Sequence, residues 1–323
     1  MPSFHPYTVT AEQYASFSRV EAHGSSPLYE VLAAGVSTDP ATLSLLERVP
    51  PEKRQPNLLF ASVAYLGGVQ SDYSTFRRFV LEHEQEILEL LFTRNTQTNE
   101  VGRCAVLLPF LAQLPGPLAL LEVGASAGLC LLPDRYAYRY DDADFVGNAA
   151  SPVRLACRTR GPVPIPSALP TVVWRCGIDI HPIDVMDDDA TRWLECCIWP
   201  DQQERLTRLR AALEIARHDP APVVQGDLVD LVVDVAATAP PDATLVIFHS
   251  AVLTYLPAER RRAFAELMSK RPWIWISNEG PGVVESLQVT TPLPTPNCFV
   301  VGMGSSEVRA FAHPHGSWIE WVQ

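Results

Sequence analysis

From Pro117 onward, short apolar runs alternate with stretches of helical periodicity, and this alternation constrains the fold more than any other feature of the chain. The runs are apolar throughout, which is typical of parallel strands covered on both faces. Because strand–helix alternation builds βαβ units, the sequence predicts a doubly wound, mostly parallel α/β sheet. The expected parallel strands are residues 118–123, 171–180, 221–227, 243–250 and 272–277, with 297–304 or the segment after it antiparallel.

The chain divides at the start of these runs. Residues 1–115 carry helical patterns, with helix starts at Ser26-Pro27 and Asp39-Pro40, where proline follows a capping residue. We therefore expect a helical N-terminal region, 1–115, and an α/β domain, 116–323. Further helices are expected at 56–67, 76–90, from Thr98 or Asn99 onward, and near 127–136, 189–217 and 258–270.

Two segments of the second domain fit the alternation poorly. Residues 137–170 include the proline-rich RGPVPIPSALP, and we expect them to form an inserted arm or lid. The final stretch, EVRAFAHPHGSWIEWV, has no helix ahead of it and is expected to add one or two antiparallel strands at the sheet edge. We expect the arm and the N-terminal helices to form the part of a binding site that holds the substrate, while the sheet forms the part that holds a cofactor.

Composition narrows the classes of partner. The chain has 323 residues, 47% hydrophobic, and a net charge of −12, so it can bury a large core but attracts nucleic acid poorly. The start MPSFHPYTVT has no signal-peptide order, and no apolar run is long enough for a bilayer. Seven cysteines without a C-x-x-C are expected to be free thiols. We expect a cytoplasmic protein with a small-molecule substrate, bound neither to nucleic acid nor to a membrane.

Ligands of open α/β sheets bind beyond the carboxyl ends of the strands, so residues at those ends are the candidates for a site. The first strand ends in Glu122-Val-Gly124-Ala-Ser126-Ala-Gly128. Glycines there let a ligand approach the backbone, and a following helix offers N–H groups to a carboxylate. Glu122 is placed to hold an ammonium group. A tight strand–helix turn is the alternative interpretation.

The next two strands end in carboxylates. Asp179 follows the second strand, where one carboxylate can accept both hydroxyls of a ribose. Asp227 follows the third and is placed to accept an adenine amine. A surface aspartate and a helix N-cap are the respective alternatives.

The fourth and fifth strands end near the expected reacting group. His249 is a candidate general base and is followed by Ser250, while a structural histidine bonded to a loop carbonyl is the alternative. Tyr255, Asn278 and Glu279 are expected to line the same mouth.

Two further candidates precede the first strand. Asn99 and Arg103 are expected to face the substrate. The alternative is that Asn99 caps a helix and that the charged side chains here form a surface ion pair.

Residues 118–304 resemble a class I S-adenosylmethionine-dependent methyltransferase. WRCGIDIHPIDV is similar to the second strand of that fold, VVQGDLVDL to its third, and TLVIFHSAVLTYLP to its fourth. The whole chain resembles a bacterial domain-of-unknown-function family, family 2332, through QTNEVGRCA, LLEVGASAGL, DRYAYRY, HSAVLTYLP and SNEGPG. The resemblance implies a Rossmann-like methyltransferase fold, S-adenosylmethionine as cofactor and a small methyl acceptor. Ser126 stands where many methyltransferases have glycine. Cys130 stands where we expect asparagine in family 2332.

Other functions fit parts of the sequence. Gly124-Ala-Ser126-Ala-Gly128 matches the G-x-S-x-G elbow of serine hydrolases, with Asp227 or Asp242 and His313 or His315 as partners. An elbow serine normally follows a strand preceded by others, whereas the expected sheet opens at Leu118. A non-catalytic or repurposed cofactor-binding domain is the third possibility. His313-Pro-His315 offers too few ligands for zinc, so no metal site is expected.

Overall fold

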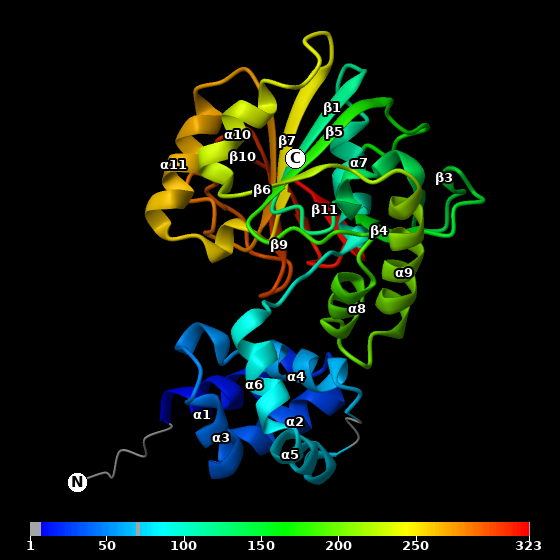
Figure 1. Ribbon diagram of the computed structural model, residues 1–323. Coiled ribbons are helices and arrows are strands. Elements are labelled where there is room, and N and C mark those ends of the chain that lie inside the picture. Colours follow the sequence, from blue (N-terminus) through cyan, green and yellow to red (C-terminus); the bar gives the residue numbers. More distant parts are fainter. Residues whose placement is uncertain (1–7, 69–71, 323) are drawn as a thin grey trace. The chain divides into compact units, whose positions relative to one another are not determined.

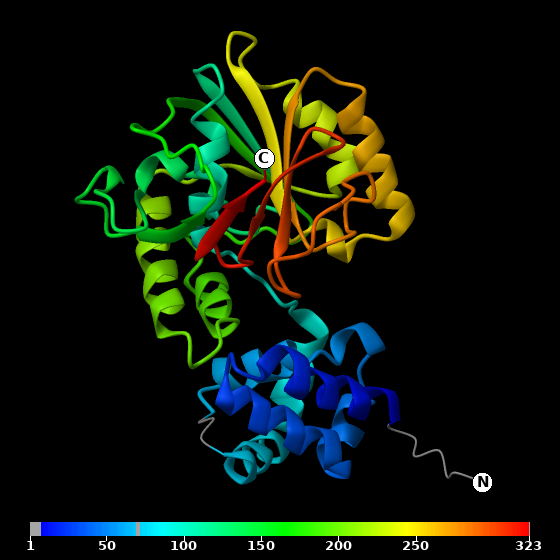
Figure 2. The same ribbon diagram turned by 180° about the vertical axis from the view of Figure 1, so that it is seen from behind.

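Figures 1 and 2 show a computed structural model of the protein, which describes residues 8–68 and 72–322. The start MPSFHPY lies outside the described residues. The chain forms two compact units, one of residues 1–98 and 188–207 and the other of residues 99–187 and 208–323. No helix in the described part of the chain is both long and apolar enough to cross a membrane. All seven cysteines are free.

The first unit is helical, and its caps confirm the expected helix starts. Ser26 Oγ accepts the N–H of Tyr29, and the Asp39 carboxylate accepts the N–H groups of Ala41 and Thr42. The single helix expected over 76–90 is wrong, because the chain breaks at His83 into two helices. The helices are α1 (Thr8–Ser16), α2 (Pro27–Thr38), α3 (Pro40–Leu46), α4 (Pro56–Tyr65), α5 (Tyr73–Glu82), α6 (Glu84–Thr93) and α8 (Asp188–Cys196), with a π-helix at Phe17–Ala22.

Helix α8 belongs to this unit although it follows the fifth β-strand of the chain by sequence. Trp193 is 1% exposed in the core of the helical unit, and its Nε1 donates to the Asn95 carbonyl at 2.8 Å. The expected continuous helix at 189–217 is also wrong. Pro200 cannot continue a helix, and the chain turns there before α9 (Gln203–His218).

The second unit contains one sheet, which joins eleven strands of the described chain in the order β3-β2-β4-β11-β10-β9-β8-β7-β1-β5-β6. Neighbours in the run β6-β5-β1-β7-β8 pair in parallel, which confirms the five expected parallel strands. β9 pairs antiparallel with β8, also as expected. The strands of this part are β1 (Leu118–Val123), β5 (Val172–Asp179), β6 (Val223–Gln225), β7 (Thr244–Ser250), β8 (Ile274–Glu279) and β9 (Phe299–Met303).

The expected arm at 137–170 is wrong, because this segment extends the sheet. It forms β2 (Ala137–Tyr140), β3 (Val146–Gly147) and β4 (Arg154–Arg160), and β4 pairs in parallel with both β2 and β11 (Trp318–Trp321). Alternate side chains of β4, such as Leu155 and Cys157, are buried, which is the period of a strand. The hairpin of β10 (Glu307–Ala312) and β11 therefore lies inside the sheet, not at its edge.

Helices cover both faces of the parallel strands (Figures 1 and 2). α10 (Leu228–Ala236) and α11 (Ala258–Ser269) lie on one face and α7 (Cys104–Leu111) on the other. α11 confirms the helix expected at 258–270. The helix expected near 127–136 is wrong: the chain forms two 3-10 turns, Leu129–Leu131 and Pro133–Arg135, because Pro133 interrupts the backbone hydrogen bonding that a helix needs.

Candidate functional site

The loop after β1 has an unusual backbone. Gly124, Ser126 and Gly128 have φ angles of 75°, 51° and 68°, so alternate residues are left-handed. Glycine adopts this conformation readily, whereas serine does so at a cost of about 1–2 kcal/mol. Ser126 therefore occupies a position that favours glycine. Its residue surface is only 3% exposed.

Asp179, at the end of β5, holds this loop. Its Oδ2 accepts the N–H of Ser126 at 2.7 Å, and its Oδ1 accepts the N–H of His181 at 2.8 Å. Each carboxylate oxygen has a second lone pair, so these bonds leave acceptor capacity on both. Asp179 is half-buried, which keeps part of the carboxylate accessible.

Strand alternation divides the other candidates between the two faces of the sheet. Glu122 pairs in register with Phe248, and Ser250 pairs with Asn278. Paired residues of parallel strands point to the same side, and Phe248 and Ser250, two residues apart in β7, also point to the same side. Glu122, Ser250 and Asn278 therefore share one face. His249 and Glu279 belong to the other face.

Arg103 links the first group. Its Nη1 donates to the Ser250 carbonyl at 2.9 Å and its Nε to the Pro314 carbonyl at 3.0 Å. Asn278 Nδ2 contacts Ser250 Oγ at 2.9 Å. The structure thus brings Arg103, Ser250 and Asn278 together, and both of these Arg103 donors bind backbone carbonyls.

Asn99 reaches the loop itself. Its Nδ2 donates to the Ala125 carbonyl at 2.8 Å, which fixes the amide so that Oδ1 is the free end. Asn99 Oδ1 and Glu122 Oε2 are buried and have no hydrogen-bond partner. Asn99 does not cap the following turn. Glu100 does so by accepting the N–H of Gly102 at 2.9 Å.

Glu122 is 4% exposed. Burial raises the pKa of the Glu122 carboxyl well above its ordinary value, Cys130 and Asp179 raise it further, and the Arg103 guanidinium lowers it. Because a nearby positive charge favours the ionised form of a carboxyl, a cationic ligand group beside Glu122 would offset part of the cost of its burial.

His249 lies in the core on the opposite face and is 0% exposed. Its Nδ1 lies 2.8 Å from Glu279 Oε1, and the indole N–H of Trp275 donates to its Nε2 at 3.0 Å. Since Nε2 accepts, the ring proton is on Nδ1 and is donated to Glu279. Both nitrogens are therefore engaged within the core, and the geometry favours a structural role over the general base that the sequence suggested.

Glu279 also holds the segment that follows β7. Its Oε1 accepts the N–H groups of Val252 at 2.9 Å and Leu253 at 3.0 Å. Sequence analysis did not single out Val252, yet its side chain lies against the α-carbon of Gly124. Tyr255, farther along, is 76% exposed and lies outside the buried group.

Asp227 is the N-cap of α10. It accepts the N–H of Val229 at 2.8 Å and pairs with Arg260. The capping interpretation is therefore confirmed, and the adenine-binding role stays a prediction.

The profile of one family, described as an uncharacterized protein conserved in bacteria (DUF2332), matches residues 11–321. The chain belongs to DUF2332. The match spans both units and includes every candidate residue above. A search among curated proteins gave no match.

In this DUF2332 chain the features of a serine hydrolase are weak. Ser126 is nearly inaccessible, no described strand precedes β1, and a 3-10 turn replaces the α-helix that begins after a nucleophile elbow. His313 Nδ1 accepts the N–H of His315 at 3.1 Å, within one turn. Among the described residues, no three metal-binding side chains gather at one point.

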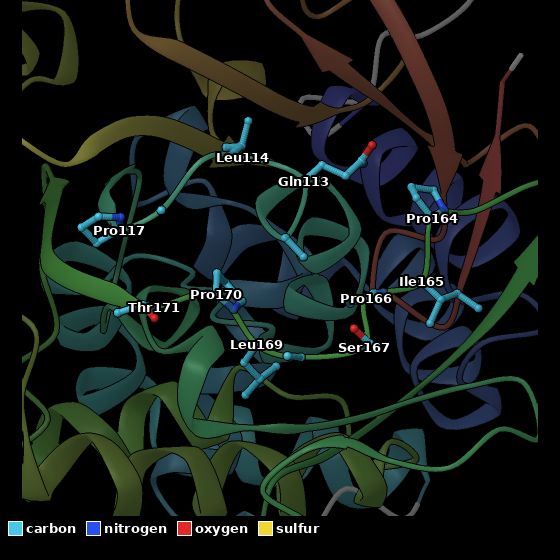
Figure 3. Close-up of a pocket in the computed structure, with 13 residues that line it drawn as sticks. Gln113, Leu114, Pro117, Pro164, Ile165, Pro166, Ser167, Leu169, Pro170 and Thr171 are labelled. Atoms are coloured by element: carbon cyan, nitrogen blue, oxygen red, sulfur yellow. The ribbon is translucent and has the colours of Figure 1, made fainter.

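Figure 3 shows a separate pocket of about 640 Å³ in the DUF2332 α/β unit. It is formed by residues 112–114, 116–117 and 164–171, which precede β1 and β5, so it lies at the amino ends of these strands. Its lining is mainly Pro, Leu and Ile, with Gln113, Ser167 and Thr171 as polar side chains. No charged or titratable side chain is among its lining residues.

Proposed function

We propose that the α/β unit binds S-adenosylmethionine and that the protein is a methyltransferase acting on a small molecule. The observation that carries the proposal is the left-handed loop of Gly124, Ser126 and Gly128, held by Asp179 at the end of the adjacent strand. From β1 the chain adds strands in one direction along the sheet, to β5 and β6, and then in the other direction, to β7 and β8, so the order of connection reverses between β1 and β7. Such a switch point is where doubly wound sheets bind ligands, and class I methyltransferases have this order of parallel strands.

The unpartnered acceptors support this choice of ligand. Glu122 Oε2 and Asn99 Oδ1 are buried at the carboxyl end of β1 and need a hydrogen-bond donor. An α-ammonium group supplies such donors, and a ribose supplies hydroxyls to the remaining lone pairs of Asp179. Glu122 and Asn99 would therefore hold the amino group and Asp179 the ribose. When bound, the cofactor would supply an electrophilic methyl group.

The site lacks one feature that the sequence predicted. A 3-10 turn follows the loop, so no α-helix N-terminus faces a ligand carboxylate. Asp227 is occupied by its cap and by Arg260. The proposal therefore depends on the donors of the ligand, its ammonium and its hydroxyls, more than on its anionic group.

Calorimetry with S-adenosylhomocysteine tests the proposal. Wild type should bind, and Asp179→Ala should weaken binding by about 1.5–3 kcal/mol, the scale of hydrogen bonds to a charged group. Asp242→Ala, at an exposed aspartate of the same unit, is the matched control and should bind as wild type does. Equal affinity in all three proteins would show that Asp179 does not bind the ligand. Failure of the folded wild type to bind would rule out S-adenosylmethionine as the cofactor.

A second candidate function is cofactor binding without methyl transfer. The observation that favours it is His249, whose two ring nitrogens are both engaged within the protein, so that the expected base is not offered to a substrate. Release of S-adenosylhomocysteine from S-adenosylmethionine in the presence of small-molecule acceptor pools separates the two functions. Tight binding without any release would support the second.

A further inference from the structure

We propose that residues 251–256 form a gate over the glycine loop, with Val252 as its plug and Glu279 as its latch. The ligand that the gate admits is the one proposed above, so that part of the inference rests on the proposed function. The closed arrangement itself stands on the contacts of the described residues.

The plug is the side chain of Val252. A Cβ built on Gly124 would lie 2.5 Å from Val252 Cβ and closer still to its Cγ2, so the valine fills the space beside this glycine. That space is where a glycine loop lets a ligand approach the backbone. In the closed arrangement Val252 takes the place that a ligand would use. A ligand reaching Gly124 must therefore displace it.

The latch is a single carboxylate oxygen. Glu279 Oε1 accepts the backbone N–H groups of both Val252 and Leu253, together with the Nδ1 proton of His249. His249 is itself fixed by Trp275, so the carboxylate is held at a defined position in the core. The latch thus connects the gate to β7 and β8.

The hinge is at Ala251. Its φ angle is 55°, a left-handed conformation that alanine rarely adopts. Beyond it, Thr254 and Tyr255 are exposed, and Leu253 is the buried anchor of the segment. Val252 and Leu256 pack against the core cluster that contains Leu253, so opening breaks these contacts together with the Glu279 hydrogen bonds, and strain at Ala251 offsets part of that cost.

Hydrogen exchange tests the gate without any ligand. In wild type, the amides of Val252 and Leu253 should exchange at least tenfold faster than the central amides of β1, because they open without unfolding of the sheet. Glu279→Gln keeps the shape but replaces the carboxyl group with an amide, and it should speed their exchange a further several-fold. Glu285→Gln, at an exposed glutamate paired with Arg262, is the matched control and should leave it unchanged. Exchange of the two amides only at the rate of β1 would overturn the gate.

Binding kinetics test what the gate admits. Val252→Ala shortens the plug and should raise the association rate of S-adenosylhomocysteine several-fold while the protein stays folded by circular dichroism. An unchanged association rate would show that Val252 does not control access and would overturn the gate. If neither protein binds, the proposed function fails, and the exchange experiment still decides the gate by itself.

Discussion

Replacing Gly124 with alanine should destabilise the α/β unit for two separable reasons. At the φ angle of 75° an alanine costs about 1–2 kcal/mol relative to glycine. The new methyl group would also overlap Val252, and overpacking of this kind costs about 1–3 kcal/mol. The sum is a loss of roughly 2–5 kcal/mol in the free energy of unfolding.

Two further variants separate the terms. Gly304 has a similar φ angle, 68°, but a Cβ there would meet nothing within 4 Å, so Gly304→Ala should cost only the conformational term. Val252→Gly removes the clashing atoms. In that background Gly124→Ala should again cost only about 1–2 kcal/mol.

Urea unfolding followed by tryptophan emission and circular dichroism measures all four proteins and the double variant. The coupling between positions 124 and 252 should be about 1–3 kcal/mol, since contacting residues are not additive. If Gly124→Ala costs no more than Gly304→Ala, or if Val252→Gly brings no relief, the proposed packing of Val252 on the loop is refuted.

Substitutions at three other positions test neighbouring features. Burial raises the pKa of Glu122, so its contribution to stability is complete below the unfolded pKa of about 4.3 and is lost as the pH rises through the folded value. Glu122→Gln, which stays neutral, should therefore gain stability over wild type between about pH 5 and 8 in urea unfolding, and a constant difference would argue against a raised pKa. Ser126→Gly replaces a serine in the left-handed conformation and should stabilise the folded protein by up to about 1 kcal/mol. Ser126→Gly and Ser126→Ala should both bind S-adenosylhomocysteine with an affinity within a few-fold of wild type. Fluorophosphonate labelling of wild type at Ser126 would indicate a hydrolase instead. Asp227→Ala should lower the melting temperature through loss of a cap that contributes about 0.5–2 kcal/mol, and Asp227→Asn, which can still cap, should lower it less.

The parallel strands could be predicted from the sequence because each lies in a short, largely apolar run between helical patterns. β1 is buried at all six positions, which gives a continuous apolar run with little ambiguity. The extension of the sheet was harder to predict. β4 carries a two-residue alternation, but β3 is only two residues long, and a proline-rich segment follows.

The placement of α8 could not be predicted from local patterns. The helix follows β5 along the chain, where a doubly wound fold expects a crossover helix. Its packing is decided by Trp193, whose buried ring lies in the core of the other unit. Local sequence indicates that such a helix is amphipathic, but not which core its apolar face joins.

The candidate site could be predicted as a set of positions but not as an arrangement. Strand ends identify Asp179, Ser250 and Asn278 because these ends meet at one edge of the sheet. The two-residue alternation separates His249 from Ser250 and sends it to the opposite face. Val252 carried no chemical signal of its own; only its position directly after β7 could have indicated that it would lie over Gly124.

The sheet also ends in a way that bears on how this protein behaves at high concentration. Its two outermost strands are β3, of two residues, and β6, of three. A long free edge offers a row of unpaired backbone groups to which another chain can add, and short edges leave little template for such association. By continuing past β11 to β4, β2 and β3, the chain covers the hydrogen-bonding edge of its C-terminal hairpin. Shortening the segment 137–160 would expose that edge and should make the protein prone to aggregate.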